Sequence, residues 1–227
     1  MIASPQPRNP RQLVVMARWS APGRCKSRLA AGTGKLRAAA IQARLTTHTL
    51  AAALQLRALT AASGHLPAPD LVLAVDGLGN RAAQRWNGTF AGTRLRRQGR
   101  GSLAVRLQRQ LGHARREGAR AVVVVGSDLP SLQASDLLAA FEALEQVPLV
   151  LGPAHDGGYW LIGLTGQAIA THGAANRLFC GGDGAIAWGS ERVLSQTLAA
   201  ATAAGLPWQL LAEHADLDRP EDLQAWQ

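Results

Sequence analysis

The stretch Ala121-Val-Val-Val-Val-Gly-Ser-Asp-Leu-Pro130 decides the fold, because four consecutive valines lead into a glycine, a serine and a lone carboxylate. Consecutive β-branched residues without polar alternation are typical of a strand buried on both faces, as in a parallel sheet covered by helices. Pro130 cannot continue a hydrogen-bonded ladder, so the strand must end before it. Asp128 therefore follows the carboxyl end of the strand, the edge at which open α/β sheets bind ligands. A helix cap is the alternative role for Asp128 at this point, since aspartate is a favoured cap residue.

A second apolar stretch has the same character. Residues 147–164 contain two apolar runs, which flank a polar, glycine-rich turn with Asp156 in it. Gly157 and Gly158 permit backbone conformations closed to other residues, and they let a ligand approach the main chain. A plain hairpin would need these glycines as well, but it would not need the histidine and the two aromatic residues that surround them. We therefore predict that Asp128 and Asp156 end neighbouring strands and act in one site.

Strands and helices alternate along the rest of the chain. This alternation predicts an α/β fold, a three-layer α/β/α sandwich with a mostly parallel sheet and one antiparallel hairpin. Further strands are expected at residues 12–17, 70–75, 89–97 and 206–211, and helices at 35–59, at 132–146, at 188–204 and from about 216 onward. The stretch 98–107 leads into a further expected helix, which ends near 117–118.

The bulk composition fits one folded domain. The chain has 227 residues, of which 47% are hydrophobic, and this is enough for a full core. We expect a single domain over residues 1–227, with a flexible segment at 1–10. No apolar run approaches the ~20 residues that cross a bilayer, and the start lacks the apolar centre of a signal peptide. We therefore expect a cytoplasmic protein without a membrane partner. Cys25 and Cys180 lack metal-ligand spacing and are expected to be free thiols.

The formal net charge of +9 raises the question of a nucleic-acid partner, because clustered cations release counterions from a phosphate backbone. The distribution argues against one. Arginine is scattered along the chain, and no recognition helix, zinc finger or aromatic RNA-binding motif is evident. We therefore expect no nucleic-acid partner. Two basic stretches, 18–28 and 94–109, remain of interest.

The first basic stretch forms a loop between the first expected strand and a helix. Arg24, Lys26 and Arg28 follow a Pro22-Gly23 turn. In an extended loop, alternate side chains project to one side, and three cations there suit an oxygen-rich anion such as a phosphate. The loop lacks the Walker A pattern. A solvated basic turn is the alternative.

The acidic stretch 216–223 has two interpretations. Asp218 comes before a proline and an acidic pair, which is typical of a helix N-terminus and needs no chemistry to explain it. The alternative is that Asp216 or Asp218 supplies a third acidic group to the site.

Taken in order, six motifs resemble one bacterial family. The chain resembles the glycosyltransferase-like proteins known as radical-SAM/selenodomain-associated transferases, which are related to 2-phospholactate guanylyltransferases and molybdenum-cofactor nucleotidyltransferases. The resemblance spans nearly the whole chain and implies the glycosyltransferase-A fold. It is much less specific for the reaction. The motifs are Ala-Pro-Gly-Arg-x-Lys-Ser-Arg-Leu (21–29), Gln-Gly with a later Leu and Arg (98–106), Gly-Ser-Asp-Leu-Pro (126–130), Gly-Pro-Ala-x-Asp-Gly-Gly-Tyr-Trp-Leu-Ile-Gly-Leu (152–164), Trp-x-Ser (188–190) and Asp-Leu-Asp-x-Pro-Glu-Asp-Leu (216–223).

The resemblance also implies roles for single residues. Asp128 and Asp156 would be the catalytic pair and would bind Mg²⁺ or Mn²⁺, with Asp218 as a third candidate ligand. Such hard cations prefer carboxylate oxygens together with substrate phosphates. The nucleotide and its phosphates would be held by Arg24, Lys26, Arg28, Gln98, Gly157 and Gly158.

The activity that the resemblance implies is metal-dependent transfer from a nucleotide or nucleotide-sugar donor to a small-molecule acceptor, in the manner of a glycosyltransferase. One alternative is a nucleotidyltransferase, for example guanylyl transfer to a small phosphorylated acid. Another is a nucleotide-binding protein without catalysis. The chain departs from the family pattern at Arg18, where the family usually has a lysine, and at Ser102, Ala104 and Gly189, which leaves its donor or acceptor preference and its activity open.

Overall fold

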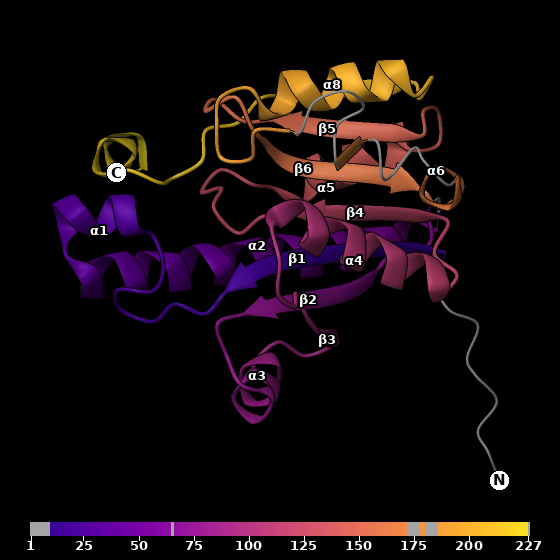
Figure 1. The fold of residues 1–227 in the computed structure, drawn as a ribbon. Coiled ribbons are helices and arrows are strands. Elements are labelled where there is room, and N and C mark those ends of the chain that lie inside the picture. Colours follow the sequence, from indigo (N-terminus) through magenta and orange to yellow (C-terminus); the bar gives the residue numbers. More distant parts are fainter. Residues whose placement is uncertain (1–9, 65, 172–177, 180–185, 227) are drawn as a thin grey trace, which may run out of the picture.

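A computed structural model describes residues 10–64, 66–171, 178–179 and 186–226, and these form a sheet covered by helices (Figure 1). The flexible segment expected at 1–10 lies outside the described residues apart from Pro10, as does Cys180. The described sheet has seven strands in the order β3-β2-β1-β4-β6-β5-β7. Their bounds are β1 Arg11–Arg18, β2 Asp70–Asp76, β3 Thr93–Arg97, β4 Ala121–Val125, β5 Leu149–Pro153, β6 Tyr159–Thr165 and β7 Trp208–Leu210.

The valine run forms β4 at the centre of the sheet, and all five of its residues are buried. The parallel pairs are β1 with β2, β1 with β4, β2 with β3 and β5 with β7. Strand β6 runs antiparallel to both β4 and β5. The predicted sheet, mostly parallel with one antiparallel hairpin, is confirmed.

Helices cover both faces of the sheet. One core cluster joins the sheet to α2 (Lys35–Ser63), α3 (Asn80–Asn87) and α5 (Ala134–Ala143). A second cluster, on the other face, joins it to α4 (Leu103–Arg116), α6 (Gly166–Ala170) and α8 (Val193–Ala203). The three-layer prediction is thus confirmed. No helix in the described part of the chain is long and apolar enough to cross a membrane.

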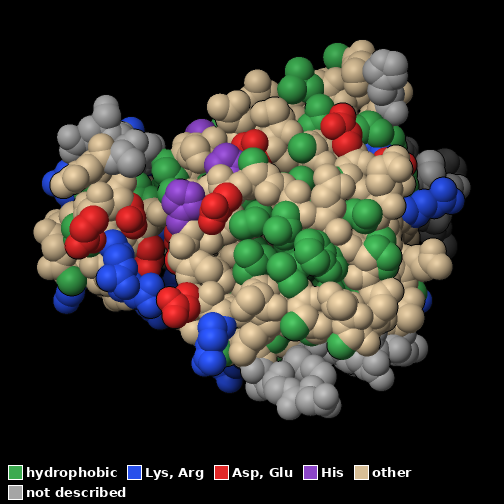
Figure 2. Space-filling model, turned by 90° about the horizontal axis from the view of Figure 1, so that it is seen from above, with side chains coloured by type: hydrophobic (Ala, Val, Ile, Leu, Met, Phe, Trp, Pro, Cys, Tyr) green, Lys and Arg blue, Asp and Glu red, His purple; other side chains and the backbone are tan. Residues whose placement is uncertain are grey.

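A short helix and the end of the chain flank the carboxyl edge of the central strands. There α1 (Ser27–Thr33) packs beside the 3-10 helix η1 (Pro220–Trp226) (Figure 1). Charged side chains gather at this end of the molecule, whereas hydrophobic side chains gather over the middle of the same face (Figure 2). The charged end is therefore the place to look for a polar site.

Three elements differ from the sequence-based prediction. The helix expected from residue 188 begins at Val193, because Gly189 takes a left-handed conformation with φ of 85° and the chain turns there. The last helix is a 3-10 helix that begins at Pro220. Helix α3 lies in a segment for which no helix was predicted. It has a single buried residue, Ala83, and is held by Trp86, whose ring contacts Trp19 edge-on with centroids 5.1 Å apart.

Candidate functional site

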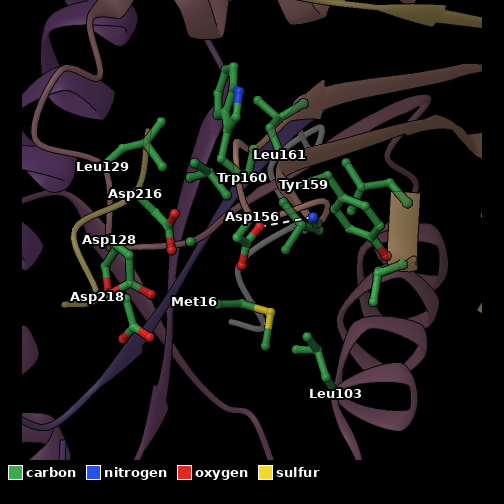
Figure 3. A pocket seen from close by; sticks show the side chains of 18 of the residues that line it. Met16, Leu103, Asp128, Leu129, Asp156, Tyr159, Trp160, Leu161, Asp216 and Asp218 are labelled. Carbon is green, nitrogen blue, oxygen red and sulfur yellow. Dashed lines mark hydrogen bonds between the residues drawn. The ribbon is translucent and has the colours of Figure 1, made fainter. Parts of the chain in front are cut away.

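A cavity of about 470 Å³ opens where β1 and β4 end and β6 begins. One side of it is acidic. Asp128, Asp156, Asp216 and Asp218 all line the cavity, and we call them the acidic side. Figure 3 shows Asp128, Asp216 and Asp218 close together, with Asp156 next to them. The carboxylates come from three separate segments of the chain, so only the fold brings them together.

Sheet topology explains why Asp128 and Asp156 share the cavity. Val125, the last residue of β4, pairs with Leu161 near the start of β6. Because the two strands are antiparallel, the end of one and the beginning of the other lie at the same edge. Asp128 does not cap the following helix, since the cap of α5 is Gln133 in a capping box with Asp136. The alternative of a simple cap is therefore excluded for Asp128.

The turn between β5 and β6 holds Asp156 through the backbone. Its Oδ1 accepts a hydrogen bond of 2.9 Å from the Gly158 amide, and Gly158 lines the cavity. Gly157 does not line the cavity. It has φ of 82°, and a Cβ there would lie 2.0 Å from the carbonyl oxygen of Glu191. The structure therefore places Gly157 in a close backbone contact with the segment before α8.

Lys26 is bonded to protein acceptors on the acidic side. Its ammonium lies 2.7 Å from Oδ1 of Asp128 and donates to the carbonyl of Leu217 at 2.6 Å. It also lies 3.9 Å from Asp218, and its side chain is only 4% exposed. Lys26 itself has a left-handed backbone with φ of 47°. A phosphate at this position would have to exchange places with one of these acceptors.

The other two cations of the loop do not join Lys26. Arg24 is exposed and lies outside the cavity lining. Arg28 also lies outside it and pairs with Asp218 at 3.0 Å. The extended loop that would align the three side chains is not formed, because Ser27 already begins α1 and the left-handed Lys26 breaks the two-residue alternation.

Gln98 lines the cavity but is committed to the sheet. Its buried amide nitrogen donates to the carbonyls of Ala17 and Ala74 at 3.1 and 3.0 Å, so it ties the ends of β1 and β2 together. Its carbonyl oxygen accepts from Nη1 of Arg106 at 3.3 Å. The structure thus places Gln98 next to a second cation of the cavity, one to which the sequence-based prediction gave no role.

A segment near the end of the chain, residues 211–219, completes the acidic side, and we call it the C-terminal arm. Leu217 is fully buried against α1 and α2, and its amide donates to the carbonyl of Asp128 at 2.9 Å. Asp216 and Asp218 on either side of it therefore line the cavity. Burial raises the pKa of Asp216, and the neighbouring charge of Asp156 raises it further. The Asp218 carboxylate pairs with Arg28 at 3.0 Å and lies 3.9 Å from Lys26, while the carboxylate of Asp222 accepts the amides of Asp218 and Arg219.

The opposite side of the cavity is apolar. Met16, Leu103 and Tyr159 face the acidic side across it (Figure 3). The ring of Tyr159 also meets Trp188 edge-on, with centroids 6.4 Å apart. Burial raises the pKa of Tyr159, so its phenol stays neutral. Leu103 is 47% exposed. Leu103 and Tyr159 lie in two of the motifs quoted above, but the sequence did not predict a common wall, because its members come from different elements.

Comparison with known proteins identifies the family of this chain. Residues 59–190 match the model of a family described as uncharacterized proteins conserved in bacteria, DUF2064. The chain belongs to DUF2064. No curated protein matches the chain significantly. The motif-based resemblance to a bacterial, glycosyltransferase-like family is confirmed at this level.

Solved structures share the DUF2064 fold. A provisionally named nucleotide-diphospho-sugar transferase from Desulfovibrio desulfuricans G20 is 23% identical with a TM-score of 0.72, over 93% of this chain and 83% of that one. CMP:2-keto-3-deoxy-manno-octonic acid synthetase complexed with CTP is 12% identical with a TM-score of 0.55, over 95% and 96%. The 4-diphosphocytidyl-2C-methyl-D-erythritol synthase from Anaerococcus prevotii DSM 20548 is 9% identical with a TM-score of 0.55, over 96% and 97%. These likenesses confirm the fold.

Three of the departures of this DUF2064 chain from the motif pattern, at Ser102, Ala104 and Gly189, have local structural roles. The side chain of Ser102 caps α4 by accepting from the Val105 amide at 3.4 Å. Ala104 is buried in the core beneath this first turn. Gly189 lines the cavity beside Trp188 and supplies a left-handed turn. None of the three adds a charged group to the cavity.

Proposed function

We propose that this chain is a metal-dependent transferase that uses a nucleotide-activated donor. The convergence of Asp128, Asp156 and Asp216 on one side of the cavity supports the proposal most directly. Like charges in one partly buried place are unfavourable unless a cation relieves them, and the raised pKa of Asp216 reflects this. A site of this kind is suited to bind a cation together with an anionic substrate.

The carboxylates fit a hard divalent cation that shares its ligands with substrate. In the described residues, no group of three or more His, Cys, Asp and Glu side chains is placed to hold a metal by itself. Mg²⁺ is usually bound by one or two carboxylates together with waters and substrate phosphates. Asp128 and Asp156 would be the protein ligands, with Asp218 as a further candidate. A bound Mg²⁺ or Mn²⁺ would stabilise the negative charge that builds on a leaving phosphate.

The protein side chains would orient the donor around this centre. Lys26 lies at the acidic side and would donate to a phosphate oxygen in place of the Leu217 carbonyl. Arg28 would reach the same region only if its exposed side chain left Asp218. The apolar wall of Met16, Leu103 and Tyr159 suits the uncharged part of a ligand and excludes water from it.

Proteins of similar fold support a nucleotide as the ligand. One of them was solved in complex with CTP, and another is named as a nucleotide-diphospho-sugar transferase. These names favour transfer of a sugar or of a nucleotidyl unit over other reactions. We propose a small-molecule acceptor. The cavity volume of about 470 Å³ supports this, because it lies within the usual range for small-molecule sites.

The second basic stretch supports a small ligand over a nucleic acid. Four of its six arginines are bonded to acceptors within the protein, so the stretch does not present a free cationic face. Arg94 and Arg96 pair with Glu117, Arg106 pairs with Asp76, and Arg109 donates to the carbonyls of Gln98 and Arg100.

A ligand panel tests the proposal. Nucleoside triphosphates and nucleotide sugars are added with and without Mn²⁺, and the melting temperature is measured, because a ligand of the native state raises it. We expect at least one nucleotide to stabilise the protein only when Mn²⁺ is present. Turnover assays with that nucleotide then separate a glycosyltransferase, a nucleotidyltransferase and a non-catalytic binding protein. If no nucleotide shifts the melting temperature under either condition, the proposal is wrong.

Asp128→Asn sharpens the test. We expect the variant to keep its fold and to lose the metal-dependent part of nucleotide binding, since the amide is a poorer ligand for a divalent cation. Glu213→Gln is the matched control, because Glu213 lies on the C-terminal arm but is exposed and outside the cavity lining. Equal metal-dependent shifts in both variants would contradict a role for Asp128.

A further inference from the structure

Two arginines share one carboxylate at a second polar corner of the cavity. Nη1 of Arg106 lies 2.8 Å from Oδ2 of Asp76, and Nη2 of Arg18 lies 3.2 Å from the same oxygen. Both arginines line the cavity, whereas Asp76 lies behind them. We call these three residues the arginine corner. None of them is part of the acidic side. Arg18 opens the first basic stretch and Arg106 lies in the second, but neither received a phosphate-binding role from the sequence.

Arg106 is held rigidly. Besides Asp76, its Nη1 reaches the Gln98 side-chain oxygen at 3.3 Å, and its Nε donates to the Gly101 carbonyl at 3.0 Å. Its Nη2 has no bonding partner among the described residues. The side chain lines the cavity and is 21% exposed. A guanidinium fixed on one edge and free on the other is prepared for an oxyanion.

The charge at this corner is not balanced. Oδ1 of Asp76 is taken by the Gly77 amide, so a single carboxylate faces two guanidinium groups and one positive charge is left over. Burial alone would raise the pKa of Asp76, but the hydrogen bond and the charge of Arg106 outweigh it and hold that pKa below its ordinary value. Asp76 is therefore ionised at neutral pH and keeps both arginines in place.

Strand order separates this corner from the acidic side. Arg18 and Asp76 end β1 and β2, while Asp128 follows β4 and Asp156 lies in the turn before β6, on the other side of β1. The acidic side thus repels anions unless a cation is bound, whereas the arginine corner attracts anions without a bound cation. A ligand with an oxyanion at the arginine corner would lie across the ends of the central strands.

We propose that Arg18 and Arg106 form an anion subsite of this cavity, which takes a phosphate or carboxylate group of a ligand. Asp76 and Gln98 are positioning residues for it. The identity of the whole ligand rests on the proposed transferase function, but the subsite itself does not. The oxyanion has two sources, a phosphate of the donor or an acidic group of the acceptor, and these have the same chemistry at the two guanidinium groups.

Inorganic phosphate and pyrophosphate probe the subsite directly. Their binding is measured by calorimetry without divalent cations and at constant ionic strength, conditions in which the acidic side repels them. Loss of one charged hydrogen-bonding group should weaken binding by about tenfold or more. We expect this loss in Arg106→Gln and in Arg18→Gln. Arg18→Gln keeps the test valid if Arg106→Gln fails to fold. The Arg18 side chain is 54% exposed, so its loss should cost little stability.

Arg100→Gln is the matched control. It removes the same charge from the loop next to Gln98, but Arg100 is exposed and outside the cavity lining. Phosphate binding in this variant should stay within about twofold of wild type, because distant surface charges are largely screened. If all three variants bind phosphate equally well, or if the wild-type protein binds neither anion, the subsite is refuted.

Positioning by Asp76 has its own readout. In Asp76→Asn the arginines lose their fixed edge, so anion affinity should fall, while binding of a neutral nucleoside should be unchanged. A merely structural effect would weaken both ligands alike, and that result would refute the positioning role.

Competition distinguishes the two sources and separates this inference from the proposed function. If phosphate competes with a nucleotide, the donor occupies the subsite, and if both bind together, the acceptor does. Both results support the anion subsite. Phosphate binding that depends on Arg106 in a protein that binds no nucleotide would refute the proposed function and leave the subsite standing. If instead a nucleotide binds in the presence of metal and phosphate binding is the same with and without Arg106, the subsite is refuted and the proposed function stands.

Discussion

The ammonium of Lys26 lies 2.7 Å from Oδ1 of Asp128, with the lysine side chain almost completely buried and the carboxylate half-exposed. The resemblance implied that Lys26 binds phosphate and that Asp128 binds metal, yet the structure pairs the two with each other. An internal cation thus neutralises part of the acidic side. Binding of a metal and a donor would therefore involve an exchange of partners at Lys26.

Removing Lys26 should have two opposite effects. Lys26→Ala leaves Asp128 unpaired and frees the Leu217 carbonyl, so we expect a loss of about 1–3 kcal/mol in the free energy of unfolding, measured with urea. The same variant should bind Mn²⁺ more tightly, since a competing positive charge is gone. Lys35→Ala is the control, because Lys35 is an exposed lysine. Weaker Mn²⁺ binding in Lys26→Ala would show that Lys26 supports the metal.

Asp216 should make the protein less stable as the pH rises. Burial and the charge of Asp156 raise its pKa in the folded state. The protonated acid therefore favours the native state at low pH, and this contribution is lost as the pH rises through the folded pKa. Asp216→Asn should be more stable than wild type at about pH 7 and indistinguishable from it in acid. Denaturation curves at several pH values measure the difference, and a constant difference across them would contradict the assignment.

Glu117 should show the opposite dependence, far from the cavity. Burial would raise its pKa, but the Gln12 amide and Arg96 and Arg94 together lower it from 4.5 to about 2. Its contribution to stability is complete above the unfolded pKa and is lost as the pH falls from there toward about 2. Glu117→Gln should cost about 2–3 kcal/mol at neutral pH and nothing in strong acid.

The same variant is a useful reference for ligand binding. Glu117 follows the C-terminus of α4, a helix of 14 residues whose first turn borders the cavity. Such a helix is about 21 Å long. Stabilisation by nucleotide or phosphate should therefore be the same in Glu117→Gln as in wild type, and a changed ligand response would mean that the two ends are coupled.

Two adjacent glycines should respond differently to alanine. Gly157 combines a positive φ with a backbone oxygen 2.0 Å from the position of a Cβ, so Gly157→Ala should lose about 2 kcal/mol or more. At Gly158 the nearest atom to a Cβ is the Asp156 carboxylate at 3.0 Å. Gly158→Ala should therefore disturb ligand binding more than stability. Thermal unfolding and metal-dependent nucleotide binding, measured on both variants, test this contrast.

The sequence predicted the sheet well because its signals there are local. An unbroken run of valines identifies β4, and the glycines around Asp156 identify the hairpin. Helix α3 was not predicted, because its eight residues bury only Ala83 and depend on the distant Trp19. Propensity within a short segment contains no information about such a contact.

The candidate site was predicted only in part, because some of its residues follow from local sequence signals and others depend on contacts between distant segments. Asp128 and Asp156 follow from strand ends, and both line the cavity. The participation of Asp216 depends on the bond between Leu217 and Asp128, which spans most of the second half of the chain. The two arginines that share Asp76 likewise come from different elements. Pairing of this kind has no sequence period and emerges only when the chain is folded.

The bond from the Leu217 amide to the Asp128 carbonyl makes that amide a natural spectroscopic reporter. It belongs to a fully buried residue, yet the carbonyl of the same residue accepts from Lys26. That carbonyl belongs to the next peptide group, between Leu217 and Asp218, so a ligand that draws Lys26 away alters the hydrogen bonding one Cα atom from the reporting amide without touching the amide itself. The nitrogen chemical shift and the hydrogen-exchange rate at Leu217 would then follow the occupancy of the cavity in a protein that has no bound label.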